Sequence, residues 1–122
     1  MNNDERALLL EIAKLAGWRL EKLATGYRLI GPHDETYGIP EKYATNDDEA
    51  WHIASLNVPD YVTDANAALT LVDTVPGTFH LQSSARGMWQ AWFDTPSVPQ
   101  ANEDTPALAI CKAWLSWKRC VT

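Results

Sequence analysis

The residues best suited to bind a small molecule form a short turn segment, Ser83-Ser84-Ala85-Arg86-Gly87. Serine hydroxyls, backbone N–H groups and one fixed guanidinium charge can together hold an anion. Trp92 and Tyr61 could stack a base of such a ligand. The candidate ligand-binding residues are therefore Ser83, Ser84, Arg86, Trp92 and Tyr61. The plain alternative, an ordinary hairpin turn, is favoured over this binding role.

The histidines lack the spacing of a metal site. His52 could pair with Asp48 one helical turn earlier, and His33-Asp34-Glu35 could offer ligands, but the chain has neither His-x-x-x-His nor Cys-x-x-Cys. His80 stands alone in a predicted strand, where a structural histidine with a satisfied hydrogen bond is expected. We therefore expect no metal site and no cofactor.

Catalysis is not expected either. The serines and cysteines lack the flanking residues of an activated nucleophile, such as Gly-x-Ser-x-Gly. Adjacent acidic residues are concentrated in the acidic segment 32–49, where nothing indicates a pocket. No catalytic residue is assigned, and a small hydrolase is the weakest of the alternatives.

The two cysteines, Cys111 and Cys120, fall on one predicted helix. Their spacing along a helix corresponds to a rise of roughly 13 Å. A disulfide needs Cα atoms within about 7 Å of each other, so the two cannot be joined within one chain. We expect Cys111 to lie in the core and Cys120 to be an exposed thiol, which fits a reducing compartment.

The elements that must position these residues centre on the stretch from Gly87 to Cys120. Residues 88–93 predict a strand that carries bulky apolar groups on both faces, with Trp89, Ala91 and Phe93 on one of them. After a loop that contains prolines, Thr105-Pro106 has the residue types that begin a helix. A sheet that is apolar on both faces needs cover on both faces. This predicts an α+β fold, a three-layer α/β/α sandwich with a small, mostly antiparallel sheet.

The rest of the chain predicts further elements. Helices are expected over 4–16, capped by Asn2 or Asn3 and ended by Gly17, and after a cap at Thr63. Strands are expected over 18–23 and 27–30, joined by a three-residue loop, and over 78–82 and 88–93. Residues 33–58 read as a polar, acidic and irregular segment, in which 50–56 could be a short helix capped near Asn46 or a strand.

Length and charge narrow the class of protein. A chain of 122 residues predicts a single domain over 1–122. The formal net charge is −6, and residues 32–49 hold six acids against one base. Without a basic stripe, nonspecific nucleic-acid binding is disfavoured. No apolar run approaches a membrane span and no signal peptide is visible, so a soluble cytoplasmic protein without a membrane partner is expected.

Several short stretches resemble one family. They are Pro59-Asp60-Tyr61-Val62-Thr63-Asp64, Ala67-Ala68, the strand Trp89-Gln90-Ala91-Trp92-Phe93, and the run from Asp104 to Ala113. Together they resemble the phage ABA sandwich domain of small prophage-encoded proteins, over roughly residues 59–117. The resemblance implies an α/β/α sandwich in a host-cell cytoplasm, and it implies no activity and no catalytic residues.

We therefore predict a non-enzymatic phage or prophage accessory protein that acts through protein binding or self-association. Apolar residues occur all around the helix that follows Pro106, more than one sheet face can bury, so a homo-oligomer is expected. The alternative is a binder of an anionic small molecule, such as a nucleotide signal in counter-defence, that uses the turn containing Arg86.

Overall fold

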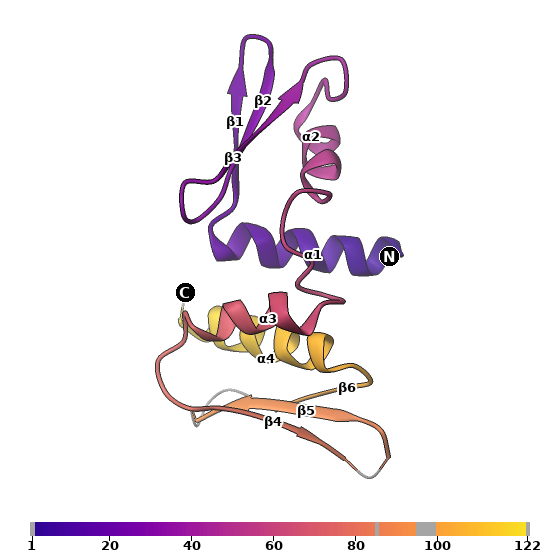
Figure 1. Ribbon diagram of the computed structural model, residues 1–122, viewed down its shortest axis with the longest axis vertical. Helices are drawn as coiled ribbons and strands as arrows, with labels where there is room; N and C mark the ends of the chain where they lie inside the picture. The colour runs from indigo at the N-terminus through magenta and orange to yellow at the C-terminus, as the bar shows by residue number, and fades with distance from the viewer. Residues whose placement is uncertain (1, 85, 95–99, 122) are drawn as a thin grey trace. The chain divides into compact units, whose positions relative to one another are not determined.

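The chain forms two compact units. The computed structural model describes residues 2–84, 86–94 and 100–121. Unit 1 comprises residues 1–59 and unit 2 comprises residues 60–122 (Figure 1). The single domain over residues 1–122 stays a prediction. Among the described residues, no helix has both the length and the apolar character that crossing a bilayer requires.

Unit 1 is built from two helices and one sheet. In chain order its elements are α1 (Asn3–Ala16), β1 (Arg19–Leu23), β2 (Gly26–Ile30), β3 (Thr36–Pro40) and α2 (Asp47–Ala54). The strands are antiparallel and follow the order β1-β2-β3. Helix α1 begins and ends as expected: the Asn2 side chain accepts a hydrogen bond from the Glu5 amide at 2.8 Å, and Gly17 closes it with φ 112°.

The β1–β2 hairpin is tighter than expected. Leu23 pairs with Gly26, so the loop contains two residues, Ala24 and Thr25, and not three. Gly26 has φ 141°, and a Cβ placed on it would lie 2.2 Å from the carbonyl oxygen of Ile39. The first residue of β2 must therefore be a glycine for two reasons, backbone conformation and the close approach of β3.

The segment 33–58 is not irregular as predicted, because it contains β3 and α2. Helix α2 is capped by Asn46, whose side chain accepts from the Glu49 amide at 2.9 Å. The Glu49 carboxylate in return accepts from the Thr45 hydroxyl at 2.5 Å and from the Thr45 amide at 3.2 Å. These hydrogen bonds lower the pKa of Glu49. Of the two alternatives for residues 50–56, the helix capped near Asn46 is the one observed.

One face of the unit 1 sheet is covered, and the other is more exposed, although Gly26 and Ile30 at the two ends of β2 are buried there. Tyr27, Leu29 and Ile39 share a face by strand register and are buried, and α2 packs on this sheet. The opposite face is charged: the Arg28 guanidinium lies 3.7 Å from the Glu21 carboxylate, and both side chains are about half exposed.

Unit 2 repeats the plan of a helical layer on an antiparallel sheet. Its elements are α3 (Ala65–Val72), β4 (Phe79–Ser83), β5 (Trp89–Phe93), β6 (Ala101–Glu103) and α4 (Pro106–Val121). The strand order is β4-β5-β6. Figure 1 shows α3 and α4 on one face of this sheet. Strand β6 was not expected, and part of the predicted proline-containing loop before it lies outside the described residues.

The caps of the unit 2 helices differ slightly from expectation. Asp64, and not Thr63, caps α3, since its side chain accepts from the Asn66 amide at 3.0 Å. The Thr63 hydroxyl instead donates to the Asp60 carboxylate. For α4 the expectation is confirmed, because the Thr105 hydroxyl accepts from the Leu108 amide at 3.2 Å.

The predicted α+β class with antiparallel strands is confirmed. The strands form two three-stranded sheets, one in each unit, where a single small sheet was expected. Within unit 2, the described helices form one layer on one face of the sheet.

The core of unit 2 centres on Trp114 of α4, which is 1% exposed. Its indole N–H donates to the Thr74 hydroxyl at 3.1 Å, in the segment that follows α3. Ala91 and Phe93 of β5 are buried against this layer. Trp89 shares their face, as the alternation predicted, but is only half-buried.

We expect Gly26→Ala to destabilise unit 1 by about 2 kcal/mol or more, because it adds both a strained φ and a backbone clash. Gly38→Ala is the matched control on β3, where no atom lies within 4 Å of an added Cβ, and it should change stability by about 0.5 kcal/mol at most. The stability change of each variant is measured by urea unfolding, in which hydrogen exchange of the unit 1 amides reports the transition. Equal losses in the two variants would contradict this account of Gly26.

We expect Trp114→Ala to cost unit 2 about 3–5 kcal/mol, as other truncations of buried aromatic side chains do. The half-buried Trp117 of the same helix provides the control, and its alanine variant should lose clearly less. Urea unfolding of both variants gives the comparison. A loss below about 1 kcal/mol for Trp114→Ala would show that the core lies elsewhere.

Candidate functional site

The backbone amides of Arg86, Gly87 and Met88 in the predicted anion-binding turn donate hydrogen bonds within the turn itself. The Ser84 hydroxyl oxygen accepts from the Arg86 amide at 3.3 Å and from the Met88 amide at 3.2 Å. The Gly87 amide donates to the Ser84 carbonyl at 3.1 Å. Ala85 lies outside the described residues. This arrangement is that of an ordinary hairpin turn, with the amides directed inward and not toward a ligand.

The five predicted binding residues do not all meet. Ser83, Ser84 and Arg86 lie together at the turn. Trp92 lies away from the turn, because it pairs with His80, which precedes Ser83 by three residues in β4. Tyr61 is buried, and its carbonyl accepts a hydrogen bond from the Cys111 thiol at 2.9 Å. An anion-binding role of these residues stays a prediction, and the hydrogen bonds of the turn do not favour it.

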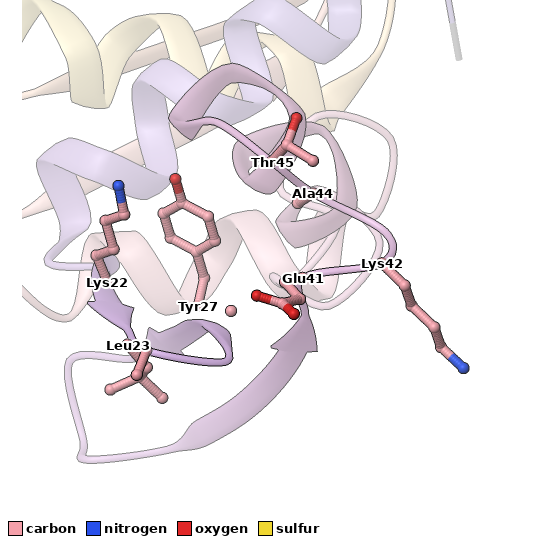
Figure 2. A pocket seen from close by; sticks show the side chains of 9 residues that line it. Lys22, Leu23, Tyr27, Glu41, Lys42, Ala44 and Thr45 are labelled. Atoms are coloured by element: carbon pink, nitrogen blue, oxygen red, sulfur yellow. The ribbon is translucent and has the colours of Figure 1, made fainter.

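Unit 1 contains a pocket of about 480 Å³ beside the β1–β2 turn (Figure 2). It is lined by Lys22, Leu23, Ala24, Gly26, Tyr27, Glu41, Lys42, Ala44 and Thr45. Lys22 and Tyr27 are cross-strand partners, and Figure 2 shows their side chains extending side by side while Lys42 points away. The Lys42 ammonium lies 5.0 Å from the ring centroid of Tyr43. The volume is within the range of small-molecule pockets.

The charges around this pocket disfavour an anionic ligand. A neighbouring hollow shares Lys22 and Tyr27 and adds the carboxylates of Asp47 and Asp48. Together with Glu41, these carboxylates outnumber the one ammonium that extends along the pocket, so an added anion would be repelled. Burial raises the pKa of Tyr27, and hydrogen bonding to Asp47 raises it further. The phenol therefore stays protonated at neutral pH and does not act as a base.

The described ranges contain no group of three or more His, Cys, Asp or Glu side chains arranged to hold a metal ion. His80 is placed as a structural histidine would be. Its ring stacks on Trp92 at a centroid distance of 4.9 Å and an interplanar angle of 8°, and its Nε2 lies 2.9 Å from the Asp94 carboxylate.

The open face of the unit 2 sheet carries a distinct set of side chains, which sequence reasoning missed. Strand register places Gln82 opposite Gln90, and Gln90 opposite Asn102. We call these three residues the carboxamide row. They and the His80–Trp92 pair share the face opposite to the buried Ala91 and Phe93, which we call the outer face. The alternation in 80–82 and 90–92 was a signal for this face, but β6 was needed to complete the row.

The four edge strands of the two sheets differ in their protection against pairing with another chain. Strand β1 carries Arg19, Glu21 and Lys22, and β3 ends in Pro40. Strand β6 has only three residues. Strand β4 has five residues, Phe79–Ser83, with no formally charged side chain and no proline. Charge, proline and shortness are the usual means of blocking an edge, so only β4 of these four edges lacks all of them.

Neither cysteine is in a disulfide, and the two differ in environment. Cys111 is fully buried. Burial, and secondarily the Asp60 carboxylate, raises the pKa of its thiol to about 12. Cys120 is exposed. Both placements were expected, and Cys111 is a core residue with no reactive character.

Iodoacetamide at pH 8 should alkylate Cys120 and leave Cys111 unmodified, because a buried thiol with a pKa near 12 supplies almost no thiolate. Cys111 should react only after the denaturant unfolds unit 2. Intact-mass and peptide mass spectrometry count and locate the label. The Cys120→Ser variant is the control and should stay unlabelled in buffer; rapid labelling of that variant would contradict the burial of Cys111.

Comparison with known proteins gives no relative. No protein-family model matches the chain, and no curated protein and no solved structure is significantly similar to it. The resemblance to the phage ABA sandwich domain stays a prediction, and any statement of function depends on the surfaces described above.

Proposed function

We propose that this protein acts without catalysis, by self-association through the edge of β4. The observation that carries the proposal is the contrast among the four edge strands. An uncharged five-residue edge without proline is a template for a further strand, and a second copy of the chain can supply that strand in a two-fold symmetric dimer.

Strand β4 has backbone N–H and C=O groups that point away from β5 and can pair with another strand. The Ser84 amide donates to the Met88 carbonyl at 2.7 Å and the Asp94 amide to the Thr78 carbonyl at 3.0 Å, so residues 78 and 84 bond toward β5. In an antiparallel pair this role alternates along the strand. Phe79, Leu81 and Ser83 therefore direct their N–H and C=O groups outward, away from β5.

Leu81 identifies the centre of the pairing. It is the middle residue of β4, and its side chain is 37% exposed although the strand lies in a packed sheet. An antiparallel β4–β4 pair with its two-fold axis at Leu81 places the two Leu81 side chains together and sets Phe79 opposite Ser83 of the second copy. The pairing covers an exposed apolar side chain and joins two three-stranded sheets into one.

The biological setting follows from the resemblance. The stretches that resemble the phage ABA sandwich domain lie almost entirely in unit 2, the unit that contains β4. We place the dimer in the host-cell cytoplasm, as a prophage accessory protein that acts by binding protein.

The mass in solution tests this proposal. At roughly tens of micromolar, a range suited to weak pairing, light scattering should give a mass near twice that of one chain. Leu81→Lys places a charge at the centre of the edge and should weaken the dimer at least about tenfold. Ser83→Pro removes one outward N–H without removing a bond to β5 and should act in the same direction.

Leu69→Lys is the matched control. Leu69 lies on α3 of the same unit and is 40% exposed, close to the value for Leu81, but it is not on the edge. This variant should dimerise as the wild type does. A monomeric wild type, or a dimer that Leu69→Lys disrupts as strongly as Leu81→Lys, would overturn the assignment to β4.

A further inference from the structure

The outer face of unit 2 has a regular arrangement that pairing of β4 does not explain. The carboxamide row crosses all three strands, since Gln82, Gln90 and Asn102 are successive cross-strand partners. Adjacent strands lie about 4.8 Å apart, so the row extends roughly 10 Å across the sheet. The helices of this unit lie on the opposite face (Figure 1).

The row has unused hydrogen-bonding capacity. Each carboxamide offers two N–H donors and one carbonyl acceptor. Within the part of the chain that the structure describes, the side chains of these three residues make no hydrogen bond or ion pair. Gln82 and Asn102 are exposed and Gln90 is half-buried. A ligand on this face would find both a donor group and an acceptor at each of the three positions.

An aromatic side chain is held beside the row. Trp92 is two residues from Gln90 on the same strand face, a separation of roughly 6.6 Å. Its indole is fixed by the stack on His80, whose ring is fixed in turn by the 2.9 Å contact with the Asp94 carboxylate. A ring that cannot rotate freely loses little entropy when a flat ligand packs on it.

The charge of this face selects the class of ligand. The carboxamide row has no formal charge, whereas the open face of the unit 1 sheet carries Arg19, Glu21 and Arg28. A phosphate or nucleic acid would find no cation in the row. A neutral polyol fits, because its hydroxyls both donate and accept as carboxamides do, and the C–H face of a sugar ring can pack on an indole.

From these observations we infer that the outer face, with Gln82, Gln90, Asn102 and Trp92, binds a neutral carbohydrate chain. The row supplies the hydrogen bonds to sugar hydroxyls and Trp92 supplies the apolar contact. The site does not require the dimer. Pairing through β4 would leave this face open and would place two copies of it on one continuous sheet.

Affinity electrophoresis tests the inference with the full chain. Native gels are cast with hydroxyethylcellulose, galactomannan or dextran, three neutral polysaccharides, and migration is compared with that in a gel without polysaccharide. At least one polysaccharide should retard the wild type. Gln90→Ala and Asn102→Ala should each weaken the retardation by about threefold to tenfold, the effect of losing one neutral hydrogen bond or two.

The controls separate this site from folding and from self-association. Asn66→Ala removes an exposed carboxamide from α3, away from the row, and should be retarded as the wild type is. Leu81→Lys should also be retarded, since the site lies within one chain. Trp92→Ala should abolish retardation, and its circular dichroism checks that it folds; the two carboxamide variants decide the test if it does not.

Three results would overturn the inference. They are unchanged migration of the wild type in all three gels, equal retardation of wild type, Gln90→Ala and Asn102→Ala, and a loss of retardation in Asn66→Ala as large as in Gln90→Ala. The first would show that no neutral polysaccharide of these kinds binds, and the others that binding occurs away from the row.

Discussion

The burial of α4 is the interaction on which unit 2 depends. Small residues of this helix, among them Ala109 and Ala113, are fully buried, and the large Trp114 extends toward the segment after α3. On the side of the sheet, Ala91 and Phe93 of β5 are buried. Because α4 packs on the face that holds Ala91 and Phe93, the opposite face is left to polar and half-buried side chains such as Gln90 and Trp92. The face of the sheet on which α4 packs therefore determines which surfaces are available for binding.

The two units share one architecture but differ in the side chains that their sheets leave exposed. Each places helices on one face of a three-stranded antiparallel sheet. In unit 1 the open face carries the Arg28–Glu21 pair and the edge strands are protected by charge and proline. In unit 2 the open face is uncharged in its carboxamide row, and β4 has an unprotected edge. This difference is why we assign binding to unit 2 and not to unit 1.

The sequence predicted the ends of the elements better than their faces. Helix caps depend on a few adjacent residues, so Asn2, Gly17 and Thr105 could be recognised as they are observed. The choice of buried face depends on packing partners far along the chain. Alternation placed Trp89 on the face of Ala91 and Phe93, yet Trp89 is half-buried, while Trp114 takes the central position.

Strand pairing set the other limit on prediction. Alternation indicated the strands around 80 and 90, but it carries no information on which strands share a sheet, so one sheet was expected where two occur. The short β6 was missed because three residues give no periodic signal. Without β6, Asn102 has no assigned neighbour and the carboxamide row cannot be recognised. The candidate turn at Arg86 was visible in composition, whereas its inward hydrogen bonds depend on coordinates.

Gly26 provides a means of recognising distant relatives of this chain. At most positions of a small sheet, substitutions accumulate until similarity is no longer detectable. Gly26 cannot change in this way, because any other residue would need a φ near 141° and would place its Cβ against the Ile39 carbonyl. A relative that keeps this sheet must keep a glycine where its second strand begins. In an alignment with any candidate relative, a glycine at the start of the second strand is therefore a necessary feature of this sheet.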